Sequence, residues 1–293
     1  MSKFHRNNGL TARIVVSFAV LTMLYLVFMS VLLYFGVGFV PIVIMVSLMI
    51  LAQFYFSDKI VMWTSGAKVV TKEQYPKLYG MVEKVALSNG LPMPKVAVMN
   101  TAVPNAFATG KSKTSSVVAV TTGIMDVLDE EELEGVIAHE LAHIRHRDVL
   151  VLTLASLFST VAFFLMRYAL FGGMYGRSRE GGGGSGMILV LIVAGITWFV
   201  SFLIIRAISR YREFAADRGG AQMTGKPDKL ASALLKIDCS MKKMPQKQLQ
   251  KVESLNAFFI IPALSGDTLS RLFSTHPPVE ERVKRLYGMV KGF

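Results

Sequence analysis

Long blocks of apolar residues alternate with polar blocks along this chain, and four of the apolar blocks contain almost no charge. Residues 14–35 and 37–56 carry no charged side chain. Residues 149–170 and 187–205 carry only Arg167 between them. A helix needs about 20 apolar residues to cross a bilayer, so each block predicts a membrane-spanning helix.

There are two alternatives to spanning helices, of which only the second stays open. A secretory signal peptide would account for the first block, but a second apolar block follows at once without a cleavage signature. The third and fourth blocks could instead be core helices of a globular domain. Between these two lie residues 172–186, which are rich in glycine. That composition is typical of a flexible linker, and we expect a loop outside the membrane.

The polar blocks show shorter periodicities. Apolar residues recur at helical spacing over residues 72–89. Two stretches typical of β-strands follow at 95–99 and 116–122, and together with the segment between them they predict a small sheet or hairpin. Asp129 with Glu132 three residues later forms a capping-box pattern, which predicts that a new helix begins there.

That helix carries His139-Glu140-Leu-Ala-His143. Two histidines four residues apart lie on one helical face and can bind one metal ion. Glu140 is offset from them, and in this HExxH pattern it acts as a general base. His146 falls on the same face, but it lies about 10.5 Å along the helix axis from His139, so we interpret it as a membrane-interface residue instead.

A carboxylate is expected to complete the metal site. Glu213 and Asp217 are four residues apart just after the fourth apolar block. If the third and fourth blocks form a hairpin, Glu213 returns to the membrane surface where the histidines lie. We assign Glu213 to the metal and Asp217 to the free N–H of a ligand histidine. The alternative is an ordinary surface ladder of charges with Arg212 and Arg218.

These motifs together resemble the HtpX family of bacterial membrane zinc proteases, which is related to the CaaX prenyl proteases. The resemblance extends from the first apolar block to about Leu286. It rests on four segments: His139-Glu-Leu-Ala-His143, Glu213-Phe-Ala-Ala-Asp217, Asn105-Ala-Phe-Ala and Ser274-Thr-His276-Pro277.

The resemblance implies a zinc endopeptidase of the bacterial inner membrane that acts in quality control and stress response. Its substrates would be membrane proteins or unfolded polypeptides. It also implies that Asn105 lies beside the substrate backbone on an edge strand and that His276 lies near the oxyanion. From the residues alone, Asn105 could be a turn residue after Pro104, and His276 could simply precede a helix start.

Charge decides the expected orientation. The net charge is +12, and only 18% of residues are charged. Most basic residues near the span ends lie on the side of the two termini, and only Arg167, Arg177 and Arg179 fall on the other. Both termini and both polar blocks should therefore be cytoplasmic. No arginine-rich arm is present, so we expect a lipid bilayer and no nucleic acid as partner; the oligomeric state stays open.

The predicted fold is mainly α: an integral membrane protein with four transmembrane helices and a cytoplasmic zincin-like α+β metalloprotease domain. The expected division is an N-terminal segment 1–13, a transmembrane hairpin 14–56, a catalytic part 57–148, a second hairpin 149–205 and a catalytic part 206–293.

The predicted chemistry is peptide hydrolysis with one Zn²⁺ per chain, bound by His139, His143 and Glu213, although Co²⁺ would suit the same ligands. Glu140 is the expected base, and residues 117–121 are the expected edge for an extended peptide. A CaaX-type prenyl-protein protease and a zinc-binding membrane scaffold without activity stay open as alternatives. The sequence has no phosphate-binding GxxxxGK[ST] motif, and the single Cys239 excludes a disulfide framework.

Overall fold

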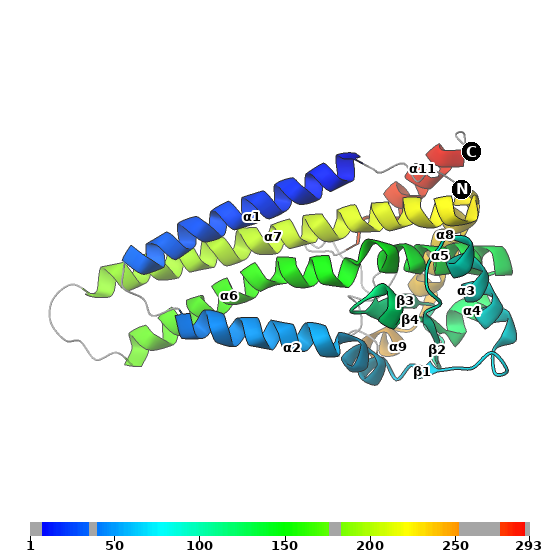
Figure 1. Ribbon diagram of the computed structural model, residues 1–293, viewed down its shortest axis with the longest axis horizontal. Coiled ribbons are helices and arrows are strands. Elements are labelled where there is room, and N and C mark those ends of the chain that lie inside the picture. The colour runs from blue at the N-terminus through cyan, green and yellow to red at the C-terminus, as the bar shows by residue number, and fades with distance from the viewer. Residues whose placement is uncertain (1–7, 35–39, 176–182, 252–275, 291–293) are drawn as a thin grey trace. The chain divides into compact units, whose positions relative to one another are not determined.

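The computed structural model describes residues 8–34, 40–175, 183–251 and 276–290. The chain divides into two compact units. The first comprises Met1–Gln53 and Val151–Ile208, and the second comprises Phe54–Leu150 and Ser209–Phe293. The described residues are mainly helical, with one four-stranded sheet in the second unit (Figure 1).

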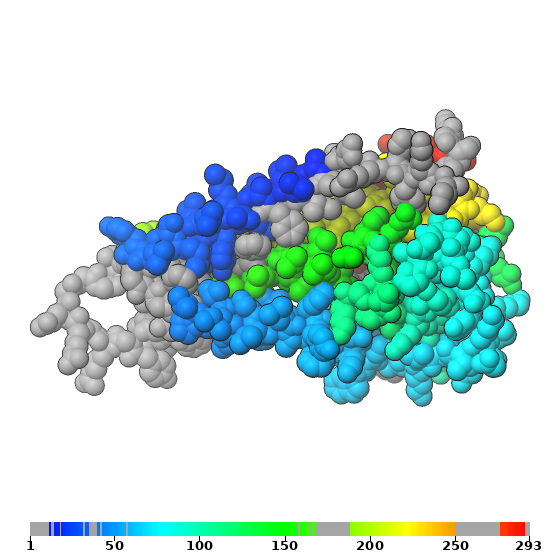
Figure 2. Space-filling view, in the orientation of Figure 1, coloured from blue at the N-terminus to red at the C-terminus, as the bar shows by residue number. Residues whose placement is uncertain are grey.

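The first unit is built from α1 (Asn8–Tyr34) and from parts of α2 (Val40–Ser65), α6 (Asp148–Tyr175) and α7 (Gly183–Thr224). A small apolar core joins these helices and includes Phe28, Val46, Val161 and Val190. Many other large apolar side chains of α1 and α2 lie on the surface (blue in Figure 2). Apolar side chains on the outside are what a lipid environment favours.

One helix of the described chain, Ile188–Thr224, is long and apolar enough to cross a membrane. The number rises to three if two bent helix pairs each count as one span, namely Val43–Phe56 with Asp58–Ser65 and Glu130–His146 with Asp148–Phe164. Val15–Val31 is a shorter apolar helix. The expectation of four crossings therefore stays a prediction.

The glycine-rich loop is shorter than residues 172–186. Helix α6 continues to Tyr175 and α7 begins at Gly183, while residues 176–182, like the turn expected at Gly36, lie outside the described part. Once a helix has formed, each further residue adds one backbone hydrogen bond, so glycines next to its end can become part of the helix. Helix α7 also runs well beyond residue 205, through Glu213 and Asp217.

The sheet of the second unit has the strand order β1-β2-β4-β3, with β1 (Lys68–Val69), β2 (Lys95–Met99), β3 (Ala106–Gly110) and β4 (Ser116–Thr121). β4 pairs parallel with β2 and antiparallel with β3, so it is an interior strand. The expectation that residues 117–121 form an edge is therefore wrong. Among the strands of the described residues, β3 pairs only with β4 and is therefore the edge next to it.

Helices cover this sheet and form the core of the unit. They are α3 (Pro76–Ser88), α4 (Thr122–Val127), α5 (Glu130–His146), α8 (Pro227–Lys243), α9 (Gln246–Lys251) and α11 (Val279–Val290), with a short 3₁₀ turn at Lys113–Ser115. α5 packs against β3, β4, α3 and α8 (Figure 1). The predicted capping box is confirmed, because Asp129 Oδ1 accepts from the Glu132 N–H at 2.9 Å and Glu132 Oε2 accepts from the Asp129 N–H at 3.0 Å.

Candidate metal centre

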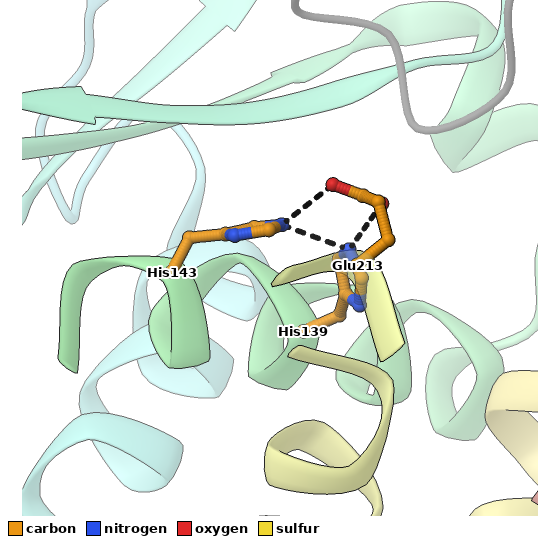
Figure 3. A group of neighbouring side chains, drawn as sticks. All are labelled: His139, His143 and Glu213. Atoms are coloured by element: carbon orange, nitrogen blue, oxygen red, sulfur yellow. Dashed lines mark hydrogen bonds and ion pairs between the residues drawn. The ribbon is translucent and has the colours of Figure 1, made fainter. Parts of the chain in front are cut away.

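Helix α5 and the part of α7 that belongs to the second unit bring three possible metal ligands together. His139 and His143 lie one turn apart on α5, and their Nε2 atoms are 3.1 Å from each other. Glu213 on α7 places Oε2 3.6 Å from His139 Nε2 and Oε1 3.5 Å from His143 Nε2 (Figure 3). The sequence placed these residues together, and the structure does the same.

The nature of these atoms suits a tetrahedral metal ion. Zinc binds nitrogen and carboxylate oxygen at about 2.0–2.2 Å, which puts two tetrahedral ligand atoms about 3.3–3.6 Å apart. The two histidine nitrogens, 3.1 Å apart, lie near this range, and each of them faces a different oxygen of Glu213, at 3.6 and 3.5 Å. One ligand atom from each of the three residues lies within 4.8 Å of the other two. The set also has the chemistry of a catalytic site, in which three protein ligands leave a fourth position for water or substrate.

Asp217 occupies the place that the sequence predicted for it. Its Oδ1 lies 3.0 Å from His139 Nδ1, so it can accept the N–H on the side of the ring away from the ligand atom. A hydrogen bond of this kind fixes the tautomer of a ligand histidine. Both side chains are buried.

Arg282 is a site residue that the sequence analysis missed. Its Nε and Nη2 donate to the two carboxylate oxygens of Asp217 at 2.8 and 2.7 Å, and its Nη1 lies 3.5 Å from Glu213 Oε2. Its guanidinium is buried. One signal was available, because Arg282 lies among Val279, Val283 and Leu286 on the buried face of α11.

A second pair of charged residues was also missed. Asp148 Oδ2 lies 2.5 Å from His143 Nδ1, and the same carboxylate pairs with Arg212. Arg212 is only 4% exposed, so it does not belong to a solvated surface ladder.

Burial and neighbouring charges shift the pKa values of the three residues. Burial alone would lower the pKa of His139, but hydrogen bonds to Asp217 and Glu213 outweigh it and raise the pKa to about 9. Burial lowers the pKa of His143 well below its usual value. Burial would raise the pKa of Glu213, but His276 and His139 outweigh it and hold that pKa well below the usual range.

Glu140 is buried between α5 and the edge strand. The Ala108 N–H of β3 donates to its carboxylate, which places the carboxylate at the strand that borders the sheet. Burial raises the pKa of Glu140 to about 7. A carboxylate tuned towards neutral pH suits a residue that takes up and returns a proton during a reaction.

His276 and Asn105 lie in different surroundings. His276 Nδ1 is 3.2 Å from Glu213 Oε2, so this histidine belongs to the cluster. Asn105 directly precedes β3, where its backbone N–H donates to Thr121 Oγ1 and its C=O accepts from the Thr121 N–H, both at 2.9 Å. The contact of Asn105 with a substrate and the oxyanion role of His276 stay predictions.

His146 is not part of the three-residue cluster. It packs against α7, with Cε1 3.6 Å from where a Cβ on Gly219 would stand.

Comparison with known proteins places this geometry in a family. The family model described as Peptidase family M48 matches residues 72–290, which include every residue of the cluster. The chain belongs to peptidase family M48. This member is 49% identical over 288 residues to the Protease HtpX homolog 2 of Methanosarcina mazei, with 98% of this chain and 97% of that one covered. It is 48% identical over 279 residues to the Protease HtpX homolog of Moorella thermoacetica, with 95% and 93% covered.

A solved structure agrees with these relatives at the level of the fold. The crystal structure of S. mikatae Ste24p superposes with a TM-score of 0.58 at 17% identity and covers 93% of this chain. The M48 chain spans 64% of the length of that protein. The resemblance to HtpX proteases drawn from the motifs is thus confirmed. With its three-residue group able to hold a metal ion, the protein is a metalloprotease of this family.

Proposed function

We propose that this protein is a zinc-dependent endopeptidase of the cell membrane that cleaves misfolded or damaged membrane proteins. The observation that carries the proposal is the convergence of His139, His143 and Glu213, whose ligand atoms lie within 4.8 Å of one another, with Glu140 next to His139 on the same helix. Zinc is the proposed ion because a set of two histidines and one carboxylate suits its tetrahedral coordination.

The residues of the chain divide the work of peptide hydrolysis. A zinc ion held by His139, His143 and Glu213 would supply the Lewis acidity that activates water and polarises the scissile carbonyl. Glu140 accepts the proton of the attacking water and passes it to the leaving amine. His276, which lies beside Glu213, donates a hydrogen bond to the oxyanion of the tetrahedral intermediate.

The edge strand β3 supplies a place for an extended substrate. Asn105 exchanges hydrogen bonds with Thr121, and pairing alternates along an antiparallel strand, so the N–H and C=O groups of Ala106 and Ala108 point away from β4. A peptide that adds to this edge as a further strand meets Glu140, because Ala108 already donates to that carboxylate. Main-chain pairing of this kind suits many sequences, as a quality-control protease requires.

Four membrane crossings with a cytoplasmic active site complete the proposal. The basic residues that flank one side of the apolar blocks support this orientation. A stripe of exposed apolar side chains on the last turns of α2 supports contact with the bilayer. The stripe consists of Tyr55, Phe56, Ile60 and Trp63, and Trp63 is 85% exposed. Lys59 and Lys111 lie over two of its rings, as is typical of a membrane interface.

Metal analysis and cleavage in detergent test the activity. We expect about one zinc ion per chain, cleavage of unfolded casein and of a membrane protein, loss of cleavage with a chelator and recovery with zinc. A prenylated peptide cleaved in preference to both would favour the CaaX-type protease instead. Zinc binding without any cleavage would favour a scaffold.

Cysteine labelling tests the orientation. After Cys239 is replaced by serine, Lys113→Cys and Gly183→Cys are introduced singly. We expect Lys113→Cys to react from the cytoplasmic side and Gly183→Cys from the other. Equal reaction of both from the cytoplasm would contradict the second transmembrane hairpin.

A further inference from the structure

The two histidines of the metal centre each have a carboxylate on the far side of the ring. For His139 it is Asp217, the partner that the sequence pattern predicts. For His143 it is Asp148, which no motif predicts. We propose that Asp148, held by Arg212, is a positioning residue that fixes the ring of His143 for metal binding and ties the end of α5 to the helix of the third ligand. The proposal rests on the metalloprotease function proposed above.

The geometry at His143 gives Asp148 a specific effect. Nδ1 of the ring is 2.5 Å from Asp148 Oδ2, while Nε2 faces His139 and Glu213 (Figure 3). A carboxylate accepts the Nδ1–H, so the lone pair must lie on Nε2, the atom that binds metal. The same contact orients the ring and makes Nε2 a stronger electron-pair donor to the metal.

The backbone reaches this arrangement through an unusual residue. Helix α5 ends at His146 and is capped by Arg147, which has φ 56° and ψ 46° and is the one described non-glycine residue with a positive φ. A left-handed conformation is unfavourable for a side-chain-bearing residue and is retained where the surroundings demand it. Here it turns the chain so that Asp148, the first residue of α6, comes back beside His143.

Arg212 connects this carboxylate to the third ligand. It is the residue before Glu213 on α7, and its buried guanidinium pairs with Asp148. Removing one partner of a buried ion pair leaves the other charge buried and uncompensated, which is strongly destabilising. The carboxylate of Asp148 and the guanidinium of Arg212 therefore hold each other in place. One ion pair therefore links the support of His143 to the helix that presents Glu213. At His139 the supporting carboxylate, Asp217, already lies on α7, and Arg282 of α11 pairs with it.

Zinc affinity of the metal-free protein, measured by competition with a chromophoric chelator, tests the proposal without relying on activity. We expect Asp148→Asn to weaken zinc binding by about 10- to 100-fold, the range found for partners of ligand histidines. Asp238→Asn is the matched control, because Asp238 pairs with Lys242 at an exposed site on α8, and its affinity should equal that of the wild type.

Two further readouts separate positioning from a structural role. The visible spectrum of the Co²⁺-loaded protein should change in Asp148→Asn and not in Asp238→Asn, because only the first alters the ligand field. If Asp148→Asn does not fold, Arg212→Lys keeps the charge but replaces the planar guanidinium that pairs with Asp148, and it should also weaken zinc binding several-fold. Wild-type affinity and an unchanged cobalt spectrum in the folded variants would overturn the proposal. A wild type that binds zinc but cleaves no peptide would instead refute the proposed function.

Discussion

The close approach of α7 to α5 can be tested at Gly220, where the two helices meet. A Cβ placed on Gly220 would stand 2.8 Å from the His139 backbone N and 3.0 Å from its Cα. Ordinary contacts begin at 3.4 Å, so Gly220→Ala must move the helices apart by about 0.6 Å (3.4 minus 2.8). Both obstructing atoms belong to the backbone and cannot swing aside as a flexible side chain would.

That displacement acts directly on the ligands. Glu213 lies on the same helix, seven residues before Gly220 and about 10.5 Å along its axis. Metal sites tolerate distance errors of about 0.2 Å, which is less than the expected shift. We therefore expect Gly220→Ala to weaken zinc binding by at least about 10-fold and, as an overpacked core, to lower the free energy of unfolding by about 1–3 kcal/mol.

Zinc titration and thermal unfolding of the metal-free variants provide the assay. Gly80→Ala is the matched control, because a Cβ there meets no atom within 4 Å and Gly80 lies inside helix α3. It should keep wild-type zinc affinity and gain up to about 1 kcal/mol of stability. Wild-type zinc affinity in Gly220→Ala would refute the reasoning that this contact sets the distance from Glu213 to the histidines.

Two further predictions concern the metal centre. His139→Ala and Glu213→Ala should leave substoichiometric zinc, while His146→Ala should keep about one ion per chain; metal analysis showing the reverse for Glu213 and His146 would contradict the ligand assignment. Since the pKa of His139 is raised to about 9 in the metal-free protein, its ring is protonated at pH 7 and must lose that proton to bind metal. Zinc binding at pH 7 should therefore release a proton, and the affinity should rise with pH up to about 9. Calorimetry in buffers of different ionisation enthalpy measures this release, and its absence would refute the protonated state.

The part of the site that the sequence predicts is the part determined by local spacing. A spacing of four residues places His139 and His143 on one face of any helix, and Asp129 with Glu132 marks where that helix begins. The carboxylate of Glu213 could be assigned because the apolar blocks before it suggest a hairpin that returns the chain.

The rest depends on contacts that sequence spacing does not encode. Arg282 reaches Asp217 across 65 positions, and its only local sign is its place on the apolar face of α11. Asp148 reaches His143 because Arg147 adopts a left-handed conformation that its residue type does not favour.

The interior position of β4 could have been predicted from its sequence. Residues 116–121 are all buried, and the run Val-Val-Ala-Val is typical of a strand covered on both faces rather than one with an open side. The strand order then leaves β3 as the edge.

The central claim is that Glu140 performs the proton transfer while the other three residues bind the metal, and Glu140→Gln tests it most directly. Glutamine keeps the size and polarity of the side chain but cannot accept a proton near neutral pH. The measurement is zinc content together with the rate of casein cleavage in one preparation of this variant. We predict zinc close to one ion per chain with cleavage lowered by at least about 10²-fold, since general acid–base catalysis typically contributes 10²- to 10⁴-fold. Near-normal cleavage by a fully metal-loaded Glu140→Gln protein would contradict the account.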